Sequence, residues 1–284
     1  MERFEQHEIP AEHGQSIQMR LFAPVGEPKA GVLIVPAMGV PQTFYAAFAG
    51  WLAGQGFLVA TFDYRGIGLS RRGALRQLDI DILDWARLDC AAAIETLVAR
   101  IGERPLYWVG HSLGGQILPF VPGHDRIAKM VTIATGSGYW RENTPSLRRV
   151  SWWLWYVAAP IATALCGYFP GRRLRKVGDL PSGVMRQWRR WCLDPDYAMG
   201  AEGPAARAAY AAVALPIVSL SFTDDEFMSA RNTEALHNCY SGAPRRMKRL
   251  APTEVGSRRI GHFGFFRRDF AETLWRGHLL PELA

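Results

Sequence analysis

Short apolar runs alternate with stretches of helical periodicity through the first half of the chain. Runs rich in β-branched and aromatic residues lie at positions 31–35, 57–62 and 106–109. Between them, segments 44–52 and 85–101 carry apolar residues every three or four positions, as one face of a buried helix does. Parallel strands need a crossover connection, and a helix is the usual one. The alternation therefore predicts an α/β fold, with a mostly parallel sheet flanked by helices.

Further runs extend the predicted sheet on both sides. Strands are expected at 130–134 and 216–222, with a weaker candidate at 246–250. Near the start of the chain, segments 4–9 and 17–22 are close enough in sequence to pair as an antiparallel edge. The expected sheet therefore has parallel strands at its centre and an antiparallel pair at one side.

The stretch 137–215 differs from the sheet-building sequence around it. It is too long for a simple crossover and holds six of the ten tryptophans. We interpret it as an inserted helical cap rich in tryptophan. The expected organisation is a core made of residues 1–136 and 216–284, with the cap at 137–215 between the two core segments.

The chain is basic, and most of its net charge lies in the expected cap. The formal net charge is +7, and the segment 137–215 holds eleven of the 33 Lys and Arg but only five of the 26 Asp and Glu. Such a balance favours nucleic acid, a membrane surface or an anionic substrate as partner. No nucleic-acid-binding motif accompanies the charge, and a helix with buried aromatics and solvated arginines explains the pattern at 186–191. We expect no nucleic-acid partner.

The cysteines and the known ligand-binding motifs indicate no metal and no cofactor. None of the four cysteines forms a C-x-x-C pair, and the chain has no P-loop, no G-x-G-x-x-G and no H-E-x-x-H. The first residues lack the apolar run of a secretory signal. Together with the scattered cysteines, this favours a cytoplasmic protein.

The sequence Gly110-His111-Ser112-Leu113-Gly114 directly follows a predicted strand and precedes an apolar segment compatible with a helix. It has the G-x-S-x-G pattern of a nucleophile elbow, whose glycines permit a cramped turn that raises the serine hydroxyl above the sheet. The N-terminus of a following helix would also favour negative charge there. We predict that Ser112 is a catalytic nucleophile, and not a helix-capping serine in an ordinary glycine-rich turn.

A serine hydroxyl is a poor nucleophile at neutral pH, so it needs a general base and an acid that orients the base. Among the seven histidines, His262 is distinguished by its place in a glycine-bounded loop before an apolar segment. We predict His262 as the base. Asp225, a few residues beyond the strand at 216–222, is the predicted acid, with Asp224 as the alternative and Glu226 as a third.

Acyl transfer also needs hydrogen-bond donors aimed at the oxyanion that forms, and backbone N–H groups suit this task because the fold holds them in place. Leu113, next to the predicted nucleophile, would supply one donor. The other is expected from the loop after the strand at 31–35. Pro36 has no N–H, so we assign this donor to Met38, whose side chain can also pack over the pocket.

The chain resembles the α/β-hydrolase superfamily over nearly its whole length. The order Ser, Asp, His along the chain is the one expected in that superfamily, and residues 63–70 (DYRGIGLS) are similar to its D-x-R-G-x-G-x-S loop. More narrowly, the chain resembles a bacterial group of predicted serine hydrolases, esterase-like or S33-like, through residues 167–170 (GYFP) and 187–192 (QWRRWC). Pro36-Ala37 stands where the superfamily commonly has His-Gly. The resemblance implies an α/β-hydrolase fold with an inserted cap, and acyl hydrolysis without a cofactor.

Residues 151–171 carry no charge and lie between two pairs of arginines. Taken alone, this segment resembles a membrane span. A span there would place Ser112 and His262 on opposite sides of the bilayer, and Pro160 would interrupt its helix. We therefore expect no transmembrane span, while contact of the cap with a membrane surface stays an alternative.

Together these residues predict a serine hydrolase that cleaves carboxylic ester or thioester bonds through an acyl-enzyme intermediate. His262 would take the proton of Ser112, and Asp225 would hold the imidazole in place. The N–H groups of Leu113 and Met38 would bind the oxyanion. The apolar cap favours an acyl chain in the substrate, and its charge suggests an anionic portion. An acyltransferase with the same triad, or a non-catalytic or membrane-surface binding protein of the same fold, stays an alternative.

Overall fold

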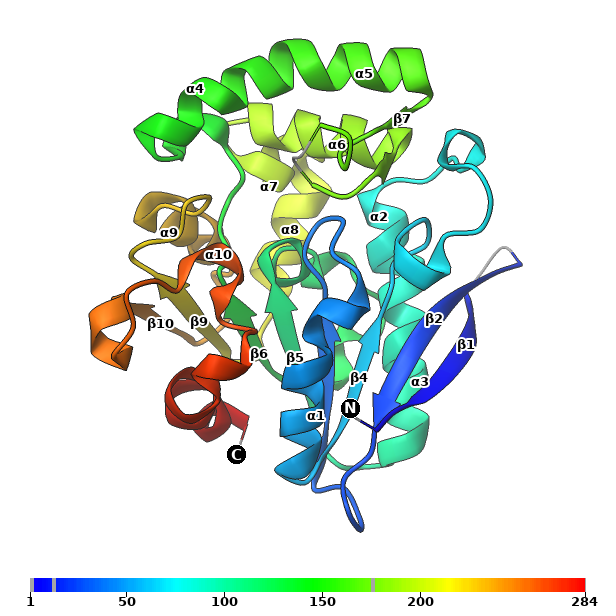
Figure 1. Ribbon diagram of the computed structural model, residues 1–284, viewed down its shortest axis with the longest axis vertical. Coiled ribbons are helices and arrows are strands. Elements are labelled where there is room, and N and C mark those ends of the chain that lie inside the picture. Colours follow the sequence, from blue (N-terminus) through cyan, green and yellow to red (C-terminus); the bar gives the residue numbers. More distant parts are fainter. Residues whose placement is uncertain (1–2, 12–13, 175–176, 284) are drawn as a thin grey trace.

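The computed structural model describes residues 3–11, 14–174 and 177–283, and a sheet of eight strands lies at its centre (Figure 1). The strands follow the order β1, β2, β4, β3, β5, β6, β9, β10. β2 is antiparallel to β1 and to β4, and every other neighbouring pair is parallel. In the order of the sheet, the strands span Glu5–Ala11, Gln15–Phe22, Phe57–Phe62, Ala30–Val35, Leu106–His111, Ile127–Ile133, Ile217–Phe222 and Arg245–Leu250.

All the predicted strands are present, including the weakly patterned one that becomes β10. The first two strands pair in antiparallel register, with Ile9 opposite Ile17, so the predicted edge is confirmed. β3, β4, β5 and β9 are buried along their whole length. This is the burial expected of parallel strands that helices cover on both faces.

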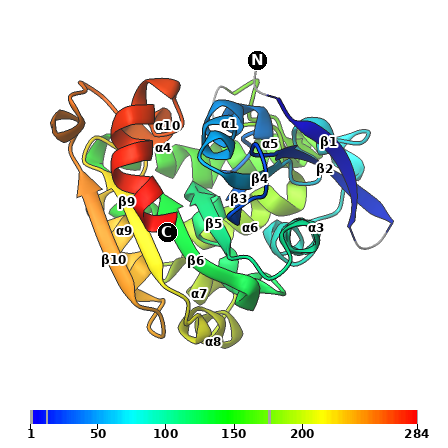
Figure 2. The ribbon, with the colours of Figure 1, turned by 90° about the horizontal axis from the view of Figure 1, so that it is seen from below.

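Helices cover the two faces of the sheet, as the view from below shows (Figure 2). α1 and the C-terminal helix lie on one face, and α3, α8 and α9 lie on the other. Successive residues of β3 point to opposite faces of the sheet. Val32 packs in the core on the α1 side, and Leu33 packs in the core on the α3 side. These helices span Ala46–Gly54, Ala271–Leu279, Ala91–Ile101, Pro204–Ala212 and Ala230–Asn238.

The segment between β6 and β9 forms a helical layer over the carboxyl ends of the parallel strands (Figure 1). α4, a π-helical turn and α5 continue one another as a single rod at the top, with α6 and α7 beneath it. The division into core and cap at 137 and 215 stays a prediction, because α8 packs on the sheet face that α3 covers. The elements of this segment span Pro145–Trp153, Leu154–Ala158, Ala159–Cys166, Ser182–Leu193 and Tyr197–Ala201, and the strands β7 and β8 span Tyr168–Phe169 and Leu180–Pro181.

The predicted helices at 44–52 and 85–101 are also present. The first begins as a 3-10 turn at Gln42–Tyr45 and continues as α1, while the second passes from α2 (Ile82–Asp84) through a π-helical turn (Trp85–Cys90) into α3. α10 spans Gly261–Gly264. The remaining 3-10 turns span Gly68–Ser70, Leu75–Gln77, Ser112–Gly115, Leu118–Phe120, His124–Arg126, Trp140–Glu142, Pro252–Val255, Arg268–Phe270 and Leu280–Leu283. None of the helices within the described ranges is long and apolar enough to cross a membrane.

Candidate active site

Ser112 lies at the turn that directly follows β5, in a backbone conformation that L-residues rarely adopt. Its φ angle is +50°, in the left-handed region. Two close approaches of the backbone enforce the turn: a Cβ on Gly114 would collide with the carbonyl of Val35, and one on Gly110 would collide with the carbonyl of Gly114. Strain of this kind persists only where the surrounding structure imposes it, and it is frequent at functional sites.

The helix expected after this turn does not form. The chain makes only two 3-10 turns, Ser112–Gly115 and Leu118–Phe120, before it reaches the next strand. The prediction was wrong because Pro119 and Pro122 lack the N–H groups that an α-helix through this segment would need. No helix N-terminus therefore faces the serine, and the backbone N–H groups of the first turn are the local donors.

His262 and Asp225 form a buried pair. The imidazole Nδ1 donates to the Asp225 carboxylate, at 2.9 Å from Oδ2 and 3.1 Å from Oδ1. Their side chains are 5% and 1% exposed. Asp225 Oδ1 also accepts the N–H groups of Phe227 and Met228, at 2.8 and 2.9 Å, which hold the carboxylate in place. With Nδ1 as donor, Nε2 is the nitrogen of the neutral ring that can accept a proton.

The two acids that flank Asp225 bind the backbone at the start of α10, the short helix that carries His262 where the sequence predicted a loop. Asp224 Oδ2 accepts the N–H groups of Ile260 and Gly261, at 2.8 and 3.1 Å. Glu226 Oε2 accepts the N–H of His262 itself, at 3.1 Å. Of the three consecutive acids, Asp225 is the one that the structure brings to the imidazole. Asp224, the alternative from the sequence, holds the loop instead.

A buried hydrogen-bond chain behind Ser112 was not foreseen from the sequence. The ring of His111 lies between two partners, with Nε2 at 3.1 Å from the carbonyl oxygen of His262 and Nδ1 at 2.9 Å from the hydroxyl of Tyr45. Burial, aided by the nearby His262, holds the pKa of His111 well below its ordinary value, so the ring is neutral. A carbonyl only accepts, so Nε2 donates to it and Nδ1 accepts from Tyr45. The sequence signal was the histidine inside the G-x-S-x-G pattern.

The hydrogen-bond chain continues from Tyr45 into the loop that follows β3. The Tyr45 hydroxyl oxygen accepts the N–H of Ala37, at 2.9 Å. No acceptor within the described ranges takes the next N–H along the loop, that of Met38. The N–H of Gly39 likewise has no acceptor among the described residues, whereas Tyr45 takes the Ala37 N–H. One continuous series of hydrogen bonds thus links the Met38 loop, through His111, to the backbone of His262.

Ser112, Leu113 and Met38 line one cavity of about 260 Å³ beneath the cap. Among the described residues, none that lines it carries a charge, and the α4–α5 rod contributes aliphatic and indole side chains to its wall, among them Leu154 and Trp155. The described basic residues between β6 and β9 therefore do not line the cavity. The structure gives no support there to the expectation that the substrate has an anionic portion.

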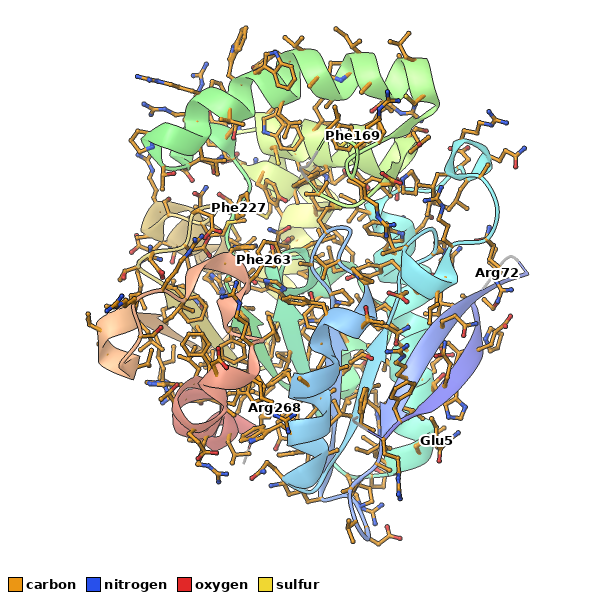
Figure 3. The ribbon with its side chains drawn as sticks, in the orientation of Figure 1. Glu5, Arg72, Phe169, Phe227, Phe263 and Arg268 are labelled. Carbon is orange, nitrogen blue, oxygen red and sulfur yellow. The ribbon has the colours of Figure 1, made fainter. Side chains whose placement is uncertain are left out.

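Aromatic rings enclose the histidine. Phe227 and Phe263 each lie with their ring centroids 5.0 Å from that of His262. Figure 3 shows both of them in the region between the cap and the carboxyl end of the sheet. Phe227, whose ring packs against that of His262, also lines the cavity that contains Ser112, while His262 itself is not among the described residues that line it. Among the residues described, no group of three or more His, Cys, Asp or Glu is arranged to hold a metal ion.

Comparison with protein families gives one match that covers most of the chain. The family model described as Serine aminopeptidase, S33 (Hydrolase_4) matches residues 26–251. The chain belongs to this family. Membership in Hydrolase_4 identifies it as a hydrolase of the α/β-hydrolase superfamily, so the resemblance inferred from the sequence is confirmed. No curated protein matches the chain.

Solved structures share the fold of this Hydrolase_4 member at low sequence identity. The Pyrococcus furiosus esterase Pf2001 is 12% identical, with a TM-score of 0.60 over 95% of this chain and 87% of the esterase. Est816, described as an N-acyl homoserine lactone degrading enzyme, is 17% identical, with a TM-score of 0.59 over 96% of this chain and all of the other. The thioesterase domain from the curacin biosynthetic pathway is 13% identical, with a TM-score of 0.54 over 88% and 93%. These similarities confirm the predicted α/β-hydrolase fold.

Proposed function

We propose that this Hydrolase_4 member is a serine hydrolase that cleaves carboxylic ester or thioester bonds of acyl substrates. The observation that carries the proposal is the strained Ser112 at the end of β5, in a cavity lined also by Phe227, whose ring packs against the imidazole of the buried His262–Asp225 pair. A backbone outlier of this kind combined with an oriented imidazole is the arrangement that activates a serine hydroxyl. The esterase and thioesterase among the structural neighbours support the same reaction class.

The proposed reaction proceeds in two halves. In the first, Nε2 of His262 takes the proton of the Ser112 hydroxyl as its oxygen attacks the substrate carbonyl, and Asp225 stabilises the imidazolium. The tetrahedral oxyanion accepts hydrogen bonds from the N–H groups of Leu113 and Met38. His262 then protonates the leaving alcohol or thiol, which leaves an acyl group on Ser112. In the second half, His262 activates water, which releases the carboxylic acid and restores the serine.

The cavity favours an uncharged, apolar acyl group. The described residues of its wall carry no charge and are mainly apolar side chains from the sheet loops and from the segment between β6 and β9. Apolar surfaces bind acyl chains by burying their methylene groups, with about 0.8 kcal/mol for each one buried. A neutral ester with a short or medium acyl chain is therefore the substrate that we propose.

Hydrolysis of p-nitrophenyl esters tests this proposal. We expect wild-type protein to release p-nitrophenol from short- and medium-chain esters, and Ser112→Ala to fold normally and lose nearly all turnover. A serine-directed phosphonate should label Ser112 and block the same activity. Labelling without ester turnover would point to an acyl acceptor other than water. Unchanged turnover in Ser112→Ala, or no labelling at all, would refute the assignment.

A further inference from the structure

The outer side of the α4–α5 rod exposes large apolar side chains. Six of the eleven exposed large apolar side chains in the described part of the chain lie on this one rod. We call this group the outer cap face: Val150, Trp152, Trp153, Tyr156, Ile161 and Leu165, which are between 42% and 82% exposed. Single exposed apolar residues are ordinary, but a group along one helix marks an interaction surface. Figure 1 shows the rod as the outermost layer on this side of the molecule.

The charged residues of the rod and of the segment that follows it have a single sign. No Asp or Glu occurs between residues 143 and 178, whereas six Lys or Arg do. Arg148 and Arg149 are exposed at the start of the rod, and Arg172 and Arg173 are exposed after its end. Neither Arg148 nor Arg149 forms an ion pair with any residue that the structure describes. The face therefore matches a partner that is apolar in its interior and anionic at its surface.

A hollow of about 350 Å³ adjoins the outer cap face. Its lining consists of Trp140, Arg148, Arg149 and Trp152. Two guanidinium groups beside two indoles suit a phosphate-bearing headgroup, because arginine binds phosphate through paired N–H donors and tryptophan favours the boundary between water and hydrocarbon.

The outer cap face is continuous with the cavity that contains Ser112. Val150 is 42% exposed and also lines that cavity. Leu154 and Trp155, on the same rod, belong to the cavity wall. One helix therefore presents apolar residues to the exterior and to the cavity at once, which gives an acyl chain an apolar path between the two.

We propose that the outer cap face docks on the surface of an anionic lipid bilayer, with Trp152 and Trp153 in the interfacial region and Arg148 and Arg149 at the phosphate groups. A helix with an apolar face and basic residues near it lies in the plane of a membrane in this way. A second copy of the chain fits this surface less well, because two such faces would oppose their arginines with no acid between them. The proposal does not depend on the reaction that Ser112 performs.

Co-sedimentation with lipid vesicles tests the docking surface. The full chain is mixed with vesicles of phosphatidylcholine alone, or of phosphatidylcholine with about one third phosphatidylglycerol, at low and high salt. We expect it to sediment with the anionic vesicles and to be released by high salt, since salt screens the arginines. The triple variant Trp152→Gln, Trp153→Gln, Leu165→Gln should lower the bound-to-free ratio about tenfold or more. The pair Arg148→Gln, Arg149→Gln should remove the preference for anionic vesicles.

Matched variants control for a general loss of apolar or basic surface. Leu69→Gln with Met247→Gln removes exposed apolar side chains elsewhere, and Arg87→Gln with Arg100→Gln removes exposed arginines elsewhere. Both pairs should bind vesicles as the wild type does. The outer-face variants should hydrolyse a soluble short-chain ester at the wild-type rate, because none of the altered side chains lines the cavity that contains Ser112.

Three outcomes would overturn the docking proposal. The first is that wild-type protein stays in solution with anionic vesicles at low salt. The second is that the outer-face variant sediments as well as the wild type, or that the control pairs lose as much binding. The third is a dimer in sedimentation velocity that the outer-face variant disrupts, without any binding to vesicles, which would assign the surface to a second copy. Loss of ester hydrolysis in Ser112→Ala tests the proposed function separately.

Discussion

At the scale of single residues, three consecutive acids have different hydrogen-bond partners around His262. Asp225 contacts the imidazole, while Asp224 and Glu226 bind backbone N–H groups of the same loop. Neighbouring carboxylates of equal charge thus have different roles, because one side chain faces the ring and its neighbours face the main chain.

This difference allows a direct test of which acid orients the imidazole of His262. Asp225→Asn should lower kcat by about 10³-fold to 10⁴-fold, because an amide cannot hold the imidazole in the tautomer that accepts the serine proton. Asp224→Asn keeps an oxygen acceptor for Ile260 and Gly261 and should lower kcat far less. Steady-state kinetics of the two variants on one p-nitrophenyl ester measure the contrast. A larger loss in Asp224→Asn would exchange the two roles.

Tyr45 is a positioning residue whose loss should alter catalysis more than binding. Tyr45→Phe removes the acceptor of the Ala37 N–H and the donor to His111, and a buried group without its partner costs about 1–3 kcal/mol. The freed Ala37 loop should place Met38 less well for the oxyanion, so kcat should fall about tenfold with KM nearly unchanged.

The matched control for Tyr45→Phe is Tyr240→Phe, because it too removes one buried hydroxyl. The Tyr240 hydroxyl donates to the backbone carbonyl of Gly115. Tyr240→Phe should lower the free energy of unfolding without the same fall in kcat. A fall in kcat of equal size in both variants would mean that Tyr45 acts through stability alone.

At the scale of elements, α9 is joined to the sheet by a neutral histidine. The hydroxyl of Thr132, in β6, donates to Nε2 of His237, and Nδ1 donates to the carbonyl of Thr233 within α9. Burial, with a smaller effect of Arg245, lowers the pKa of His237 to about 4. Protonation would place a positive charge at this buried site, where burial disfavours it, and would make Nε2 the donor to the Thr132 oxygen.

This histidine should make the protein less stable in acid. Its pKa in the unfolded chain is about 6.5, so between pH 6.5 and 4 the unfolded state binds more protons and the free energy of unfolding falls as the pH falls. The contribution lost between pH 7 and pH 5 is about 2 kcal/mol. Urea unfolding of wild type and His237→Gln at both pH values measures it, and the pH-dependent difference should be about 2 kcal/mol smaller in the variant.

Other titrating groups cancel in that comparison. Asp89, whose pKa burial raises to about 6, opposes the effect of His237 but is present in both proteins. An identical pH dependence in the two proteins would show that His237 does not carry the effect.

At the scale of the whole molecule, the position of the basic residues relative to the cavity decides whether they can contact a substrate bound there. No charged residue in the described part of the chain lines the cavity, and the exposed apolar residues of the α4–α5 rod, Val150 excepted, do not line it either. Composition alone suggested an anionic substrate. Once the helix is placed, the same charge fits an anionic surface outside the molecule better.

The amino-acid sequence by itself determined the strands, the mostly parallel sheet and the turn that carries Ser112, whereas His262, predicted in a loop, lies in the short helix α10. These follow from alternating and helical periodicity and from glycines at close approaches, which are local properties. The catalytic roles of Ser112, Asp225, His262 and Met38 stay proposals, although the structure brings Asp225 to His262 and places Ser112 and Met38 in one cavity.

The tertiary structure alone decided three features. It brought Asp225, which the sequence favoured, and not Asp224 to the imidazole, it linked Tyr45 to His111, and it turned one side of the α4–α5 rod toward the cavity and the other toward the exterior. Each depends on which way side chains point when segments far apart in the chain meet. Periodicity records which face of an element is buried, but the register between elements sets which atoms on that face come within hydrogen-bonding distance.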